Sequence, residues 1–492
     1  MIEFDWLSRW SLYTPKAVAF NDIENERIYT YEESFRASNK IASYLKAQGI
    51  VEGDKVAVLS QNKIETVFLF FALQRIGAVL VPINFRLAED EIKYIVKDSE
   101  AKLIFFEEEL LSKLNKTNDR LKKVSIERLE EQVYASADFD EVFEFVGDEQ
   151  SACQILYTSG TTGFPKGVLI TNKILFWNSV NTALSLNLTG KDSMVSFLPL
   201  FHTGGWNVLL TPFVHRGART VFLSKFDAQK VLQVCEEEKI TILFGVPTTL
   251  GIMAKDASFE TRDLSSLRFA VVGGEPMSLS MIKTWHDRNV YIRQGFGLTE
   301  CGPNCFSLSD TDAEKKIGSI GRPNFYVKTK IVDKENNEVP VGSVGELLLK
   351  GPMCMQGYWK NEKASSKAFH DGWLRTGDLV KKDDDEYYYV VGRKKEMYIT
   401  GGENVYPAEV EKVLGLHPAI DEVAVLGVKD DTWGESGKAF IVLKDGAQLD
   451  EMSISKYCSD KLAKFKIPKH ITFMQELPKS DTGKILKKQL QI

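Results

Sequence analysis

Apolar residues in the first half of the chain fall into short runs typical of strands and longer stretches typical of helices. Segments 55–60 (KVAVLS) and 78–83 (AVLVPI) predict buried strands, and segment 64–77 (IETVFLFFALQRIG) between them predicts a buried helix. The same rhythm returns over 194–199, 205–217 and 219–224, and it continues with a helix over 227–239 and a strand over 240–247. This alternation predicts α/β layers arranged as two tandem lobes.

The second half of the chain has a different pattern of apolar and turn-forming residues. Short β-like runs at 321–333, 342–351 and 386–400 are separated by Gly, Pro and Asp, which predicts a β-rich lobe. The last hundred residues predict a small α+β domain, with a helix starting at Pro407, strands over 422–428 and 438–444, and a helix over 453–464. Residues 107–150 are highly charged and predict a surface connection with a helix at 118–133.

Composition and charge narrow the class of protein. The chain has 492 residues, 43% of them apolar and 26% charged, which is typical of a soluble protein of two or three domains. A net charge of −6 argues against a general nucleic-acid binder. The most apolar stretch is broken by Gln74, Arg75 and Pro82 and falls short of a membrane span, and the N-terminus lacks the apolar core of a secretory signal. We therefore expect a cytoplasmic protein.

The six cysteines are scattered along the chain. Only Cys301 and Cys305 lie close together, and neither a second pair nor a histidine follows at the spacing of a zinc site. We therefore expect reduced thiols.

Residues 157–167 (YTSGTTGFPKG) contain the densest run of small, hydroxyl and glycine residues in the chain. Such a loop presents backbone N–H groups and hydroxyls to a phosphate, and Lys166 adds a positive charge. It is not a Walker P-loop, because Pro165 precedes the lysine and Gly167 follows it. Composition alone leaves an ordinary surface turn equally open.

Further motifs accompany this loop: LPLFHTGGW (198–206), VVGGEPMS (271–278), QGFGLTE (294–300), GELLLKGP (345–352), GWLRTGDL (372–379), GRKKEMYITGGENVYPAEVE (392–411) and PKSDTGKILKK (478–488). Together and in this order they resemble the adenylate-forming superfamily, in its acyl- and aryl-CoA synthetase branch. The resemblance spans the chain from residue 157 to near its end. It implies an N-terminal AMP-binding domain over 1–392, made of two α/β lobes and a β-rich lobe, and a small mobile α+β domain over 393–492.

The resemblance also implies a reaction in two halves. A carboxylate attacks the α-phosphate of ATP, giving an acyl-adenylate and pyrophosphate, and a thiol then displaces AMP. The implied ligands are Mg²⁺-ATP, coenzyme A and a small carboxylic acid, with no nucleic acid, in a monomer or homodimer. Because the first half is chemistry at phosphorus, we expect positioning and charge stabilisation to matter more than a general base.

By resemblance, the nucleotide contacts four groups of residues. The loop of Thr158, Ser159, Gly160, Thr161, Thr162 and Lys166 closes over the β- and γ-phosphates, Thr299 bonds the α-phosphate, and Glu300 carries Mg²⁺. The 273–276 backbone and Phe296 sandwich the adenine, and the ribose is bound by Asp378 with help from Arg393. The other residues implied to bind ATP or AMP are in the same two motifs, which contribute Gly273, Gly274, Glu275, Gln294, Gly295, Phe296 and Gly297. Taken singly, Thr299–Glu300 is a surface or cap pair, Phe296 is core packing and Asp378 is a turn residue.

Further roles depend on the second domain. The resemblance implies that Lys484 contacts the α-phosphate and the substrate carboxylate. It also implies that Lys395 is the hinge and that Gly401 and Gly402 line the thiol channel. His202 matches an aromatic gate between the acid pocket and that channel. The structural alternatives are a solvated charge for Lys484 and a capping or core residue for His202.

Candidate walls of the acid pocket are Trp206, Val246, Gly274, Gly297, Leu298 and Cys301, which are apolar or small. Residues 202–205 carry no acidic partner for an amino group, so we expect a medium-chain fatty acid or an aryl acid, with Gly274 and Gly297 leaving space for it. A free-standing CoA ligase is the leading hypothesis. An enzyme that loads a separate acyl-carrier protein is the nearest alternative, and a luciferase-like oxygenase or an inactive nucleotide-binding homologue is less favoured.

Overall fold

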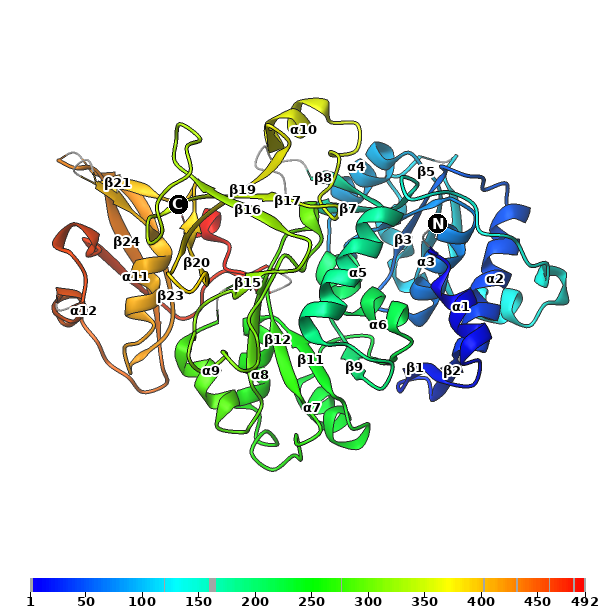
Figure 1. Ribbon diagram of the computed structural model, residues 1–492, viewed down its shortest axis with the longest axis horizontal. Helices are drawn as coiled ribbons and strands as arrows, with labels where there is room; N and C mark the ends of the chain where they lie inside the picture. The colour runs from blue at the N-terminus through cyan, green and yellow to red at the C-terminus, as the bar shows by residue number, and fades with distance from the viewer. Residues whose placement is uncertain are drawn as a thin grey trace.

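The computed structural model describes residues 3–118, 120–158, 165–275, 277–400, 403–430, 432–459, 461–480 and 483–490. Its strands form four sheets (Figure 1). Two large sheets with their helices make up most of the chain. A third sheet lies beside them, and a fourth, near the C-terminus, forms the orange and red end of the molecule in Figure 1.

The first large sheet has the strand order β6-β5-β3-β4-β7-β8. Its strands are β3 (Lys55–Leu59), β4 (Val79–Pro82), β5 (Ala101–Phe106), β6 (Lys122–Ser125), β7 (Ala152–Thr158) and β8 (Lys166–Thr171). All neighbours are parallel except the β7–β8 hairpin. The accompanying helices are α2 (Tyr31–Ala47), α3 (Ile64–Arg75) and α4 (Glu89–Ser99). Every residue of α3 is buried, as its almost continuous apolar sequence requires.

The second large sheet has nine strands in the order β15-β14-β13-β12-β11-β9-β10-β1-β2. They are β1 (Val18–Asp22), β2 (Arg27–Thr30), β9 (Ser193–Ser196), β10 (Arg219–Phe222), β11 (Ile242–Gly245), β12 (Phe269–Val272), β13 (Ile292–Phe296), β14 (Phe306–Ser307) and β15 (Arg322–Pro323). The helices of this part are α1 (Trp6–Tyr13), α5 (Asn172–Leu186), α6 (Leu210–Arg216), α7 (Ala228–Glu237), α8 (Pro247–Lys255) and α9 (Leu279–His286). Its central strands are parallel and fully buried, which explains their continuous apolar sequences.

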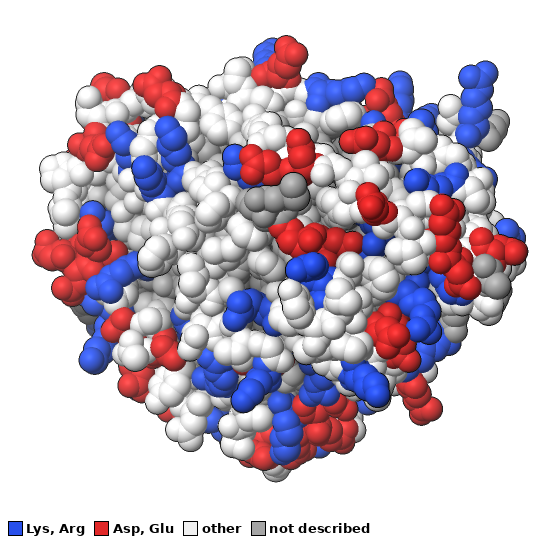
Figure 2. Space-filling model, turned by 45° about the vertical axis from the view of Figure 1, so that its right-hand side comes forward, with Lys and Arg blue, Asp and Glu red and all other residues white. Residues whose placement is uncertain are grey.

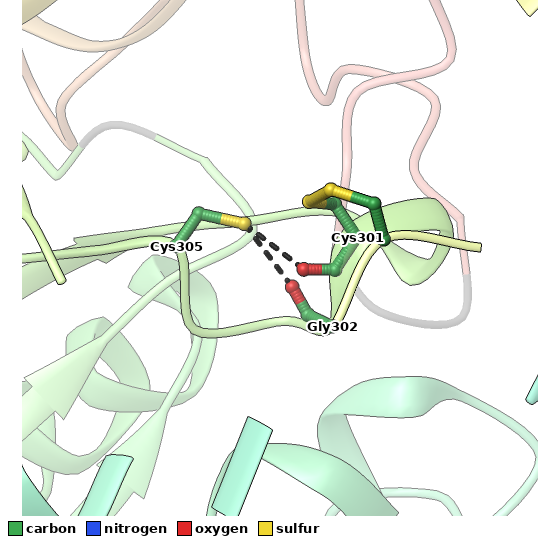
Figure 3. Close-up of a disulfide and its surroundings, with 4 residues drawn as sticks. Cys301, Gly302 and Cys305 are labelled. Atoms are coloured by element: carbon green, nitrogen blue, oxygen red, sulfur yellow. Dashed lines mark hydrogen bonds between the residues drawn. A yellow bond between two sulfur atoms is a disulfide. The ribbon is translucent and has the colours of Figure 1, made fainter. Parts of the chain in front are cut away.

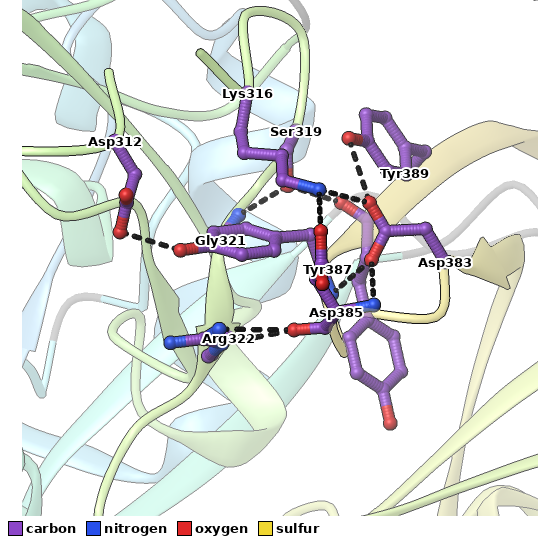
Figure 4. A network of polar contacts seen from close by, with 10 residues as sticks. Asp312, Lys316, Ser319, Gly321, Arg322, Asp383, Asp385, Tyr387 and Tyr389 are labelled. Carbon is purple, nitrogen blue, oxygen red and sulfur yellow. Dashed lines mark hydrogen bonds and ion pairs between the residues drawn. The ribbon is translucent and has the colours of Figure 1, made fainter. Parts of the chain in front are cut away.

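The third sheet is antiparallel and contains β16 (Lys328–Val332), β17 (Gly345–Lys350), β18 (Phe369–His370), β19 (Trp373–Lys382) and β20 (Tyr388–Arg393), with α10 (Glu362–Ala368) beside it. A polar network ties it to the segment that connects β14 to β15 in the nine-stranded sheet (Figure 4). Lys316 Nζ lies 2.9 Å from Asp383 Oδ2 and 2.6 Å from Asp385 Oδ2, and Ser319 donates to the Tyr388 carbonyl.

The fourth sheet contains β21 (Tyr398–Thr400), β22 (Glu403–Val405), β23 (Ile420–Asp430), β24 (Gly434–Leu443) and β25 (His470–Met474), with helices α11 (Pro407–Leu414) and α12 (Glu451–Ser459). It has a core of its own, in which Tyr398, Val410 and Ile441 are buried. This part is the predicted α+β unit, and α11 begins at Pro407 as the sequence indicates. Arg393, placed by the predicted boundary in the C-terminal domain, still belongs to β20 of the third sheet.

Three sequence predictions need correction. The helix expected over 118–133 is wrong, since β6 pairs with β5 at residues 122–125 and a short π-helix follows over Leu129–Tyr134. The last predicted helix ends at Ser459, five residues early. Cys301 and Cys354 form a disulfide, so the expectation of reduced thiols is wrong for these two, although Cys153, Cys235, Cys305 and Cys458 are free. The fold brings together two segments that lie 53 residues apart in sequence.

The surface is mixed in charge. On the face in Figure 2, Lys and Arg side chains are interspersed with Asp and Glu side chains. Among the described residues, none of the helices combines the length and apolarity needed to cross a membrane.

Candidate functional site

Four of the predicted site motifs follow the carboxyl ends of parallel strands in the nine-stranded sheet. Strands β9, β11, β12 and β13 are parallel, so their carboxyl ends meet at one edge. The segment 197–202 follows β9, Val246 follows β11, Gly273 follows β12 and Gly297 follows β13. This edge is where ligands bind in open α/β sheets. One sheet edge therefore gathers four motifs that are separated by up to about a hundred residues in sequence.

The Gly273–Gly274–Glu275 turn presents open backbone at this edge. Gly274 has φ +87°, a conformation that favours glycine, and a Cβ there would lie 3.7 Å from Val246 Cγ1. The nearest atoms to a Cβ at Gly273 would be 3.9 Å away. A flat group could therefore lie on this backbone without meeting a side chain of the turn itself. Pro276, the last residue of the predicted adenine motif, lies outside the described residues.

The end of β13 supplies the second side of the predicted adenine site. Phe296 is partly buried, and its ring meets Phe306 edge-to-face at a centroid distance of 5.7 Å. Gln294 is buried, and its Oε1 accepts from the Met277 N–H at 3.4 Å. Gly295 pairs with Ser307 across the β13–β14 ladder. Phe296 thus packs against the core and also lies at the carboxyl edge of the sheet. Its core packing is therefore compatible with contact to a ligand.

Thr299 and Glu300 lie in a single 3₁₀ turn, Thr299–Cys301, that follows β13. Glu300 is held by two contacts from residues 355–358, since its Oε1 accepts from the Tyr358 hydroxyl at 2.9 Å and its carbonyl accepts from the Met355 N–H at 2.7 Å. One carboxylate at a partly exposed position suits Mg²⁺, which is commonly held by one or two carboxylates together with substrate phosphates. The donor set therefore fits the predicted metal.

The predicted phosphate loop joins β7 to β8. Thr158 and Lys166 face each other at the end of that hairpin, and Lys166 Nζ lies 5.0 Å from the centre of the Tyr358 ring. Ser159, Gly160, Thr161 and Thr162 lie outside the described residues, as do Gly401 and Gly402 of the predicted thiol channel.

Asp378 and Arg393 are neighbours across the β19–β20 ladder. Arg393 Nε lies 2.9 Å from Asp378 Oδ1, while Asp378 Oδ2 is buried and has no hydrogen-bond partner within the described chain. Burial raises the pKa of Asp378 to about 6, and the charges of Arg393 and Lys484 oppose that rise. A buried acceptor without a donor costs free energy. Two hydroxyls of a ribose are donors that this carboxylate would satisfy.

The C-terminal part reaches the same edge through the loop that carries Lys484. Thr248, in the first turn of α8, donates from its hydroxyl to the Gly483 carbonyl at 3.2 Å. The charge of Lys484 lowers the pKa of both Asp378 and Glu275, against a larger rise that burial causes in each. Burial and the charge of Arg393 lower the pKa of Lys395, the predicted hinge residue.

The predicted acid-pocket residues differ in where they lie, since some are at the sheet edge and others are buried in the core. Val246 adjoins Gly274, and His202 lies next to Phe201 in the turn after β9, with ring centroids 4.6 Å apart. Trp206 is fully buried against Phe70, and its indole N–H donates to the Leu200 carbonyl. Leu298 precedes the 3₁₀ turn, and Cys301 is buried in the disulfide with Cys354. The structure gives Trp206 and Cys301 packing roles, and their contact with substrate stays a prediction.

The space expected at Gly297 is not present. A Cβ there would lie 2.0 Å from the Pro303 carbonyl oxygen, so a neighbouring backbone occupies the position that a larger side chain needs. Glycine at this position allows the close approach of two chain segments, and it does not open a channel toward a substrate.

Sequence reasoning missed Thr248 and Tyr358. Nothing in the sequence marks Thr248, because its contact with Gly483 depends on how two distant segments dock. Tyr358 carried a weak signal, since an aromatic pair at 358–359 stands in a polar stretch six residues after a recognised motif.

Comparison with known proteins agrees with this geometry. The family model described as AMP-binding enzyme matches residues 7–359, and the model of the AMP-binding enzyme C-terminal domain matches residues 409–484. Indoleacetate–CoA ligase of Aromatoleum aromaticum is 35% identical, covering 98% of this chain and 96% of its own. Feruloyl-CoA synthase of Amycolatopsis is 36% identical, covering 99% and 98%.

Solved structures of o-succinylbenzoate CoA synthetase from Bacillus subtilis are also similar. Its complex with the acyl-adenylate intermediate superimposes with a TM-score of 0.89 at 30% identity, covering 99% of this chain and 98% of that one. A double mutant of the same enzyme, bound to a product analogue, gives a TM-score of 0.74 with the same identity and coverage.

The first prediction concerns the pH dependence of ribose binding. Because the pKa of Asp378 is about 6, its carboxylate is ionised above that pH and becomes protonated below it. Ribose hydroxyls donate to the ionised form, so we expect adenosine affinity to be close to its maximum from about pH 7 upward, to be about half of that maximum near pH 6 and to fall further at lower pH. Titration calorimetry with adenosine measures this, since adenosine carries no phosphate that titrates in the range. Asp378→Asn should bind more weakly with a flat pH profile, and a wild-type slope retained in that variant would contradict the assignment.

The second prediction concerns Gly297. Gly297→Ala places a methyl group against the Pro303 backbone, and we expect a loss of about 1–3 kcal/mol in stability, seen as a melting temperature lower by a few degrees. The matched control is Gly251→Ala in α8, where the new Cβ would be 3.6 Å from Met281 Cε, an ordinary contact, and stability should not fall. An unchanged melting temperature for Gly297→Ala, with a shift in accepted acids, would restore the channel interpretation.

Proposed function

The chain belongs to the family of AMP-binding enzymes, and on that premise we propose that it joins an apolar aryl carboxylic acid to coenzyme A. As an ATP-dependent acid–CoA ligase, it forms an acyl-adenylate with release of pyrophosphate and then an acyl-CoA with release of AMP. The observation that carries the assignment of this activity to one place is the hydrogen bond from Thr248, in the helix that follows β11, to the Gly483 carbonyl, which docks the loop of Lys484 at the carboxyl edge of the nine-stranded sheet.

We propose that Asp378 and Arg393 hold the ribose, while the 273–275 turn and Phe296 enclose the adenine. The unpaired, buried Asp378 Oδ2 supports this role, since hydroxyl donors would satisfy it. The open backbone at Gly273 and Gly274 supports the adenine position. With the nucleoside fixed there, the α-phosphate extends toward Thr299 and the end of the Lys484 loop.

In the proposed site, Glu300 holds Mg²⁺, and Lys166 with residues 158–162 holds the terminal phosphates. Mg²⁺ would neutralise charge on the phosphates when bound. Lys484 then stabilises the charge that develops at the α-phosphate as the substrate carboxylate attacks. The main contribution of these residues is a set of charges arranged before the reaction, in a partly buried site where they act more strongly than in water.

We propose that this arrangement is the adenylating one and that residues 393–492 turn about Lys395 for the second half-reaction. The contact between Thr248 and Gly483 supports it, because that contact holds Lys484 over the nucleotide site. The difference between the TM-scores for the acyl-adenylate complex, 0.89, and the product-analogue complex, 0.74, also supports it. The turn would break the ion pair in which Lys255 Nζ lies 3.1 Å from Asp421 Oδ1.

We propose an aryl acid as the substrate. The candidate wall residues Val246, Leu298 and Trp206 carry no charge that would recognise a second carboxylate. The relatives named above act on indoleacetate and ferulate, both of which are aryl acids. A medium-chain fatty acid remains the second candidate, because an apolar wall accepts either. A cytoplasmic location belongs to the same proposal: four of the described cysteines are free thiols, whereas the disulfide between Cys301 and Cys354 is of a kind that is rare in that compartment.

The third prediction tests the activity. Purified protein with Mg²⁺-ATP should exchange labelled pyrophosphate into ATP when given an aryl acid such as an indoleacetate or a cinnamate, and less so with C6–C12 fatty acids. Added CoA should then be consumed with formation of a thioester. Absence of exchange with every acid would reject the ligase. Exchange without CoA consumption, followed by discharge to a holo-acyl-carrier protein, would favour the carrier-loading alternative.

The fourth prediction separates the two half-reactions. Lys484→Ala removes a cation from developing charge, and we expect adenylation to slow about 10²–10³-fold, by analogy with the loss of one oxyanion donor. Conversion of a pre-made acyl-adenylate to the thioester should stay near the wild-type rate, because Lys484 acts in the other domain orientation. Lys488→Ala removes an exposed lysine from the same tail and is the matched control. Equal loss of both half-reactions in Lys484→Ala would reject the domain rotation.

A further inference from the structure

We propose that Tyr358 is a positioning residue, which orients the metal-binding carboxylate of Glu300 and couples it to Lys166 of the phosphate loop. The inference rests on the proposed function, because it assigns Mg²⁺ to Glu300. It goes further in naming the residue that holds Glu300 and Lys166 at a fixed separation, although the two come from different sheets.

Residues 354–358, here called the strap, hold the 3₁₀ turn of Glu300 by three contacts. The Tyr358 hydroxyl donates to Glu300 Oε1 at 2.9 Å, and the Met355 N–H donates to the Glu300 carbonyl at 2.7 Å. The disulfide from Cys354 joins the strap to Cys301, the residue after Glu300 (Figure 3). In the same figure the Cys305 thiol donates to the carbonyls of Cys301 and Gly302. The backbone of the turn is therefore fixed independently of Tyr358, which acts on the carboxylate itself.

The other side of Tyr358 faces β8. Tyr358 forms an isolated antiparallel bridge with Val168, and the Trp359 N–H donates to the Gly167 carbonyl at 2.8 Å. Gly167 packs closely against β7, because a Cβ there would lie 2.6 Å from Ile155 Cγ2, whereas its 3.4 Å distance from Trp359 Cβ would be an ordinary contact. Lys166 Nζ lies 5.0 Å from the centre of the Tyr358 ring, within the range of a cation–π interaction.

Tyrosine suits both contacts. Its hydroxyl donates to Glu300 Oε1, as an un-ionised phenol does. A donor on one carboxylate oxygen limits rotation of the group and leaves the second oxygen for the metal. Partners of this kind typically change metal affinity or activity 10–100-fold when removed. Phenylalanine would keep the ring under Lys166 and lose only the bond to Glu300.

The fifth prediction therefore concerns Tyr358→Phe in the full chain. Titration calorimetry should give an unchanged Kd for ATP in EDTA. The additional affinity for ATP gained with Mg²⁺ should be reduced, and the Mg²⁺ concentration that gives half-maximal pyrophosphate exchange should rise about 10–100-fold. Tyr388→Phe is the matched control. It removes a part-buried hydroxyl, which lies 2.8 Å from Thr329 Oγ1 in the third sheet, and it should leave both measurements as in the wild type.

The outcomes separate this inference from the activity on which it rests. A wild type that neither binds Mg²⁺-ATP nor catalyses exchange would reject the proposed function. An active wild type with the same Mg²⁺ dependence in Tyr358→Phe would overturn only the positioning role. An equal loss of affinity for ATP in EDTA and for Mg²⁺-ATP would also overturn it, because that pattern indicates a general defect of the site.

Discussion

The approach of the 483–484 loop to the first turn of α8 is the contact on which the complete site depends. Gly483 has φ +81°, and a Cβ there would lie 2.3 Å from Thr248 Oγ1, so only glycine permits this docking. With the loop in place, the Lys484 charge acts on Asp378 and Glu275. Without it, the carboxyl edge of the sheet would lack the positive charge that we assign to the α-phosphate.

The buried carboxylates of Asp378 and Glu275 cost folding free energy in the absence of a ligand. Burial raises the pKa of both Asp378 and Glu275, and one oxygen of Asp378 has no partner within the described chain. A protein tolerates such groups where a ligand later supplies donors or charge. The cost of burying Asp378 is partly offset by Arg393 on the adjacent strand, which pairs with one oxygen and leaves the second for the ribose that we propose.

The two elements that we propose to bind the phosphates illustrate a second constraint, which is that they belong to different sheets. Lys166 stands on β8 of the six-stranded sheet, and Glu300 follows β13 of the nine-stranded sheet. Two separate sheets have no hydrogen-bond ladder to fix their spacing, so a connecting segment must do so. The strap supplies that connection. Backbone hydrogen bonds in this region reach the Glu300 turn and β8, and Tyr358 contacts Glu300 with its hydroxyl and Lys166 with its ring.

The sequence by itself determined the alternation of strands and helices, the α11 start at Pro407 and the family, because periodicity, proline geometry and ordered motifs are local properties. It also named Asp378, Glu300 and Lys484. It failed over 118–133, where pairing with β5 overrode local composition, and it missed the bond between Cys301 and Cys354. Only the tertiary structure showed that the Pro303 backbone occupies the space beside Gly297. The same holds for the hydrogen bond between Thr248 and the C-terminal loop, and for the contacts of Tyr358 with Glu300 and Lys166. Each of these depends on contacts between segments distant in sequence, and no local pattern encodes the distance between them.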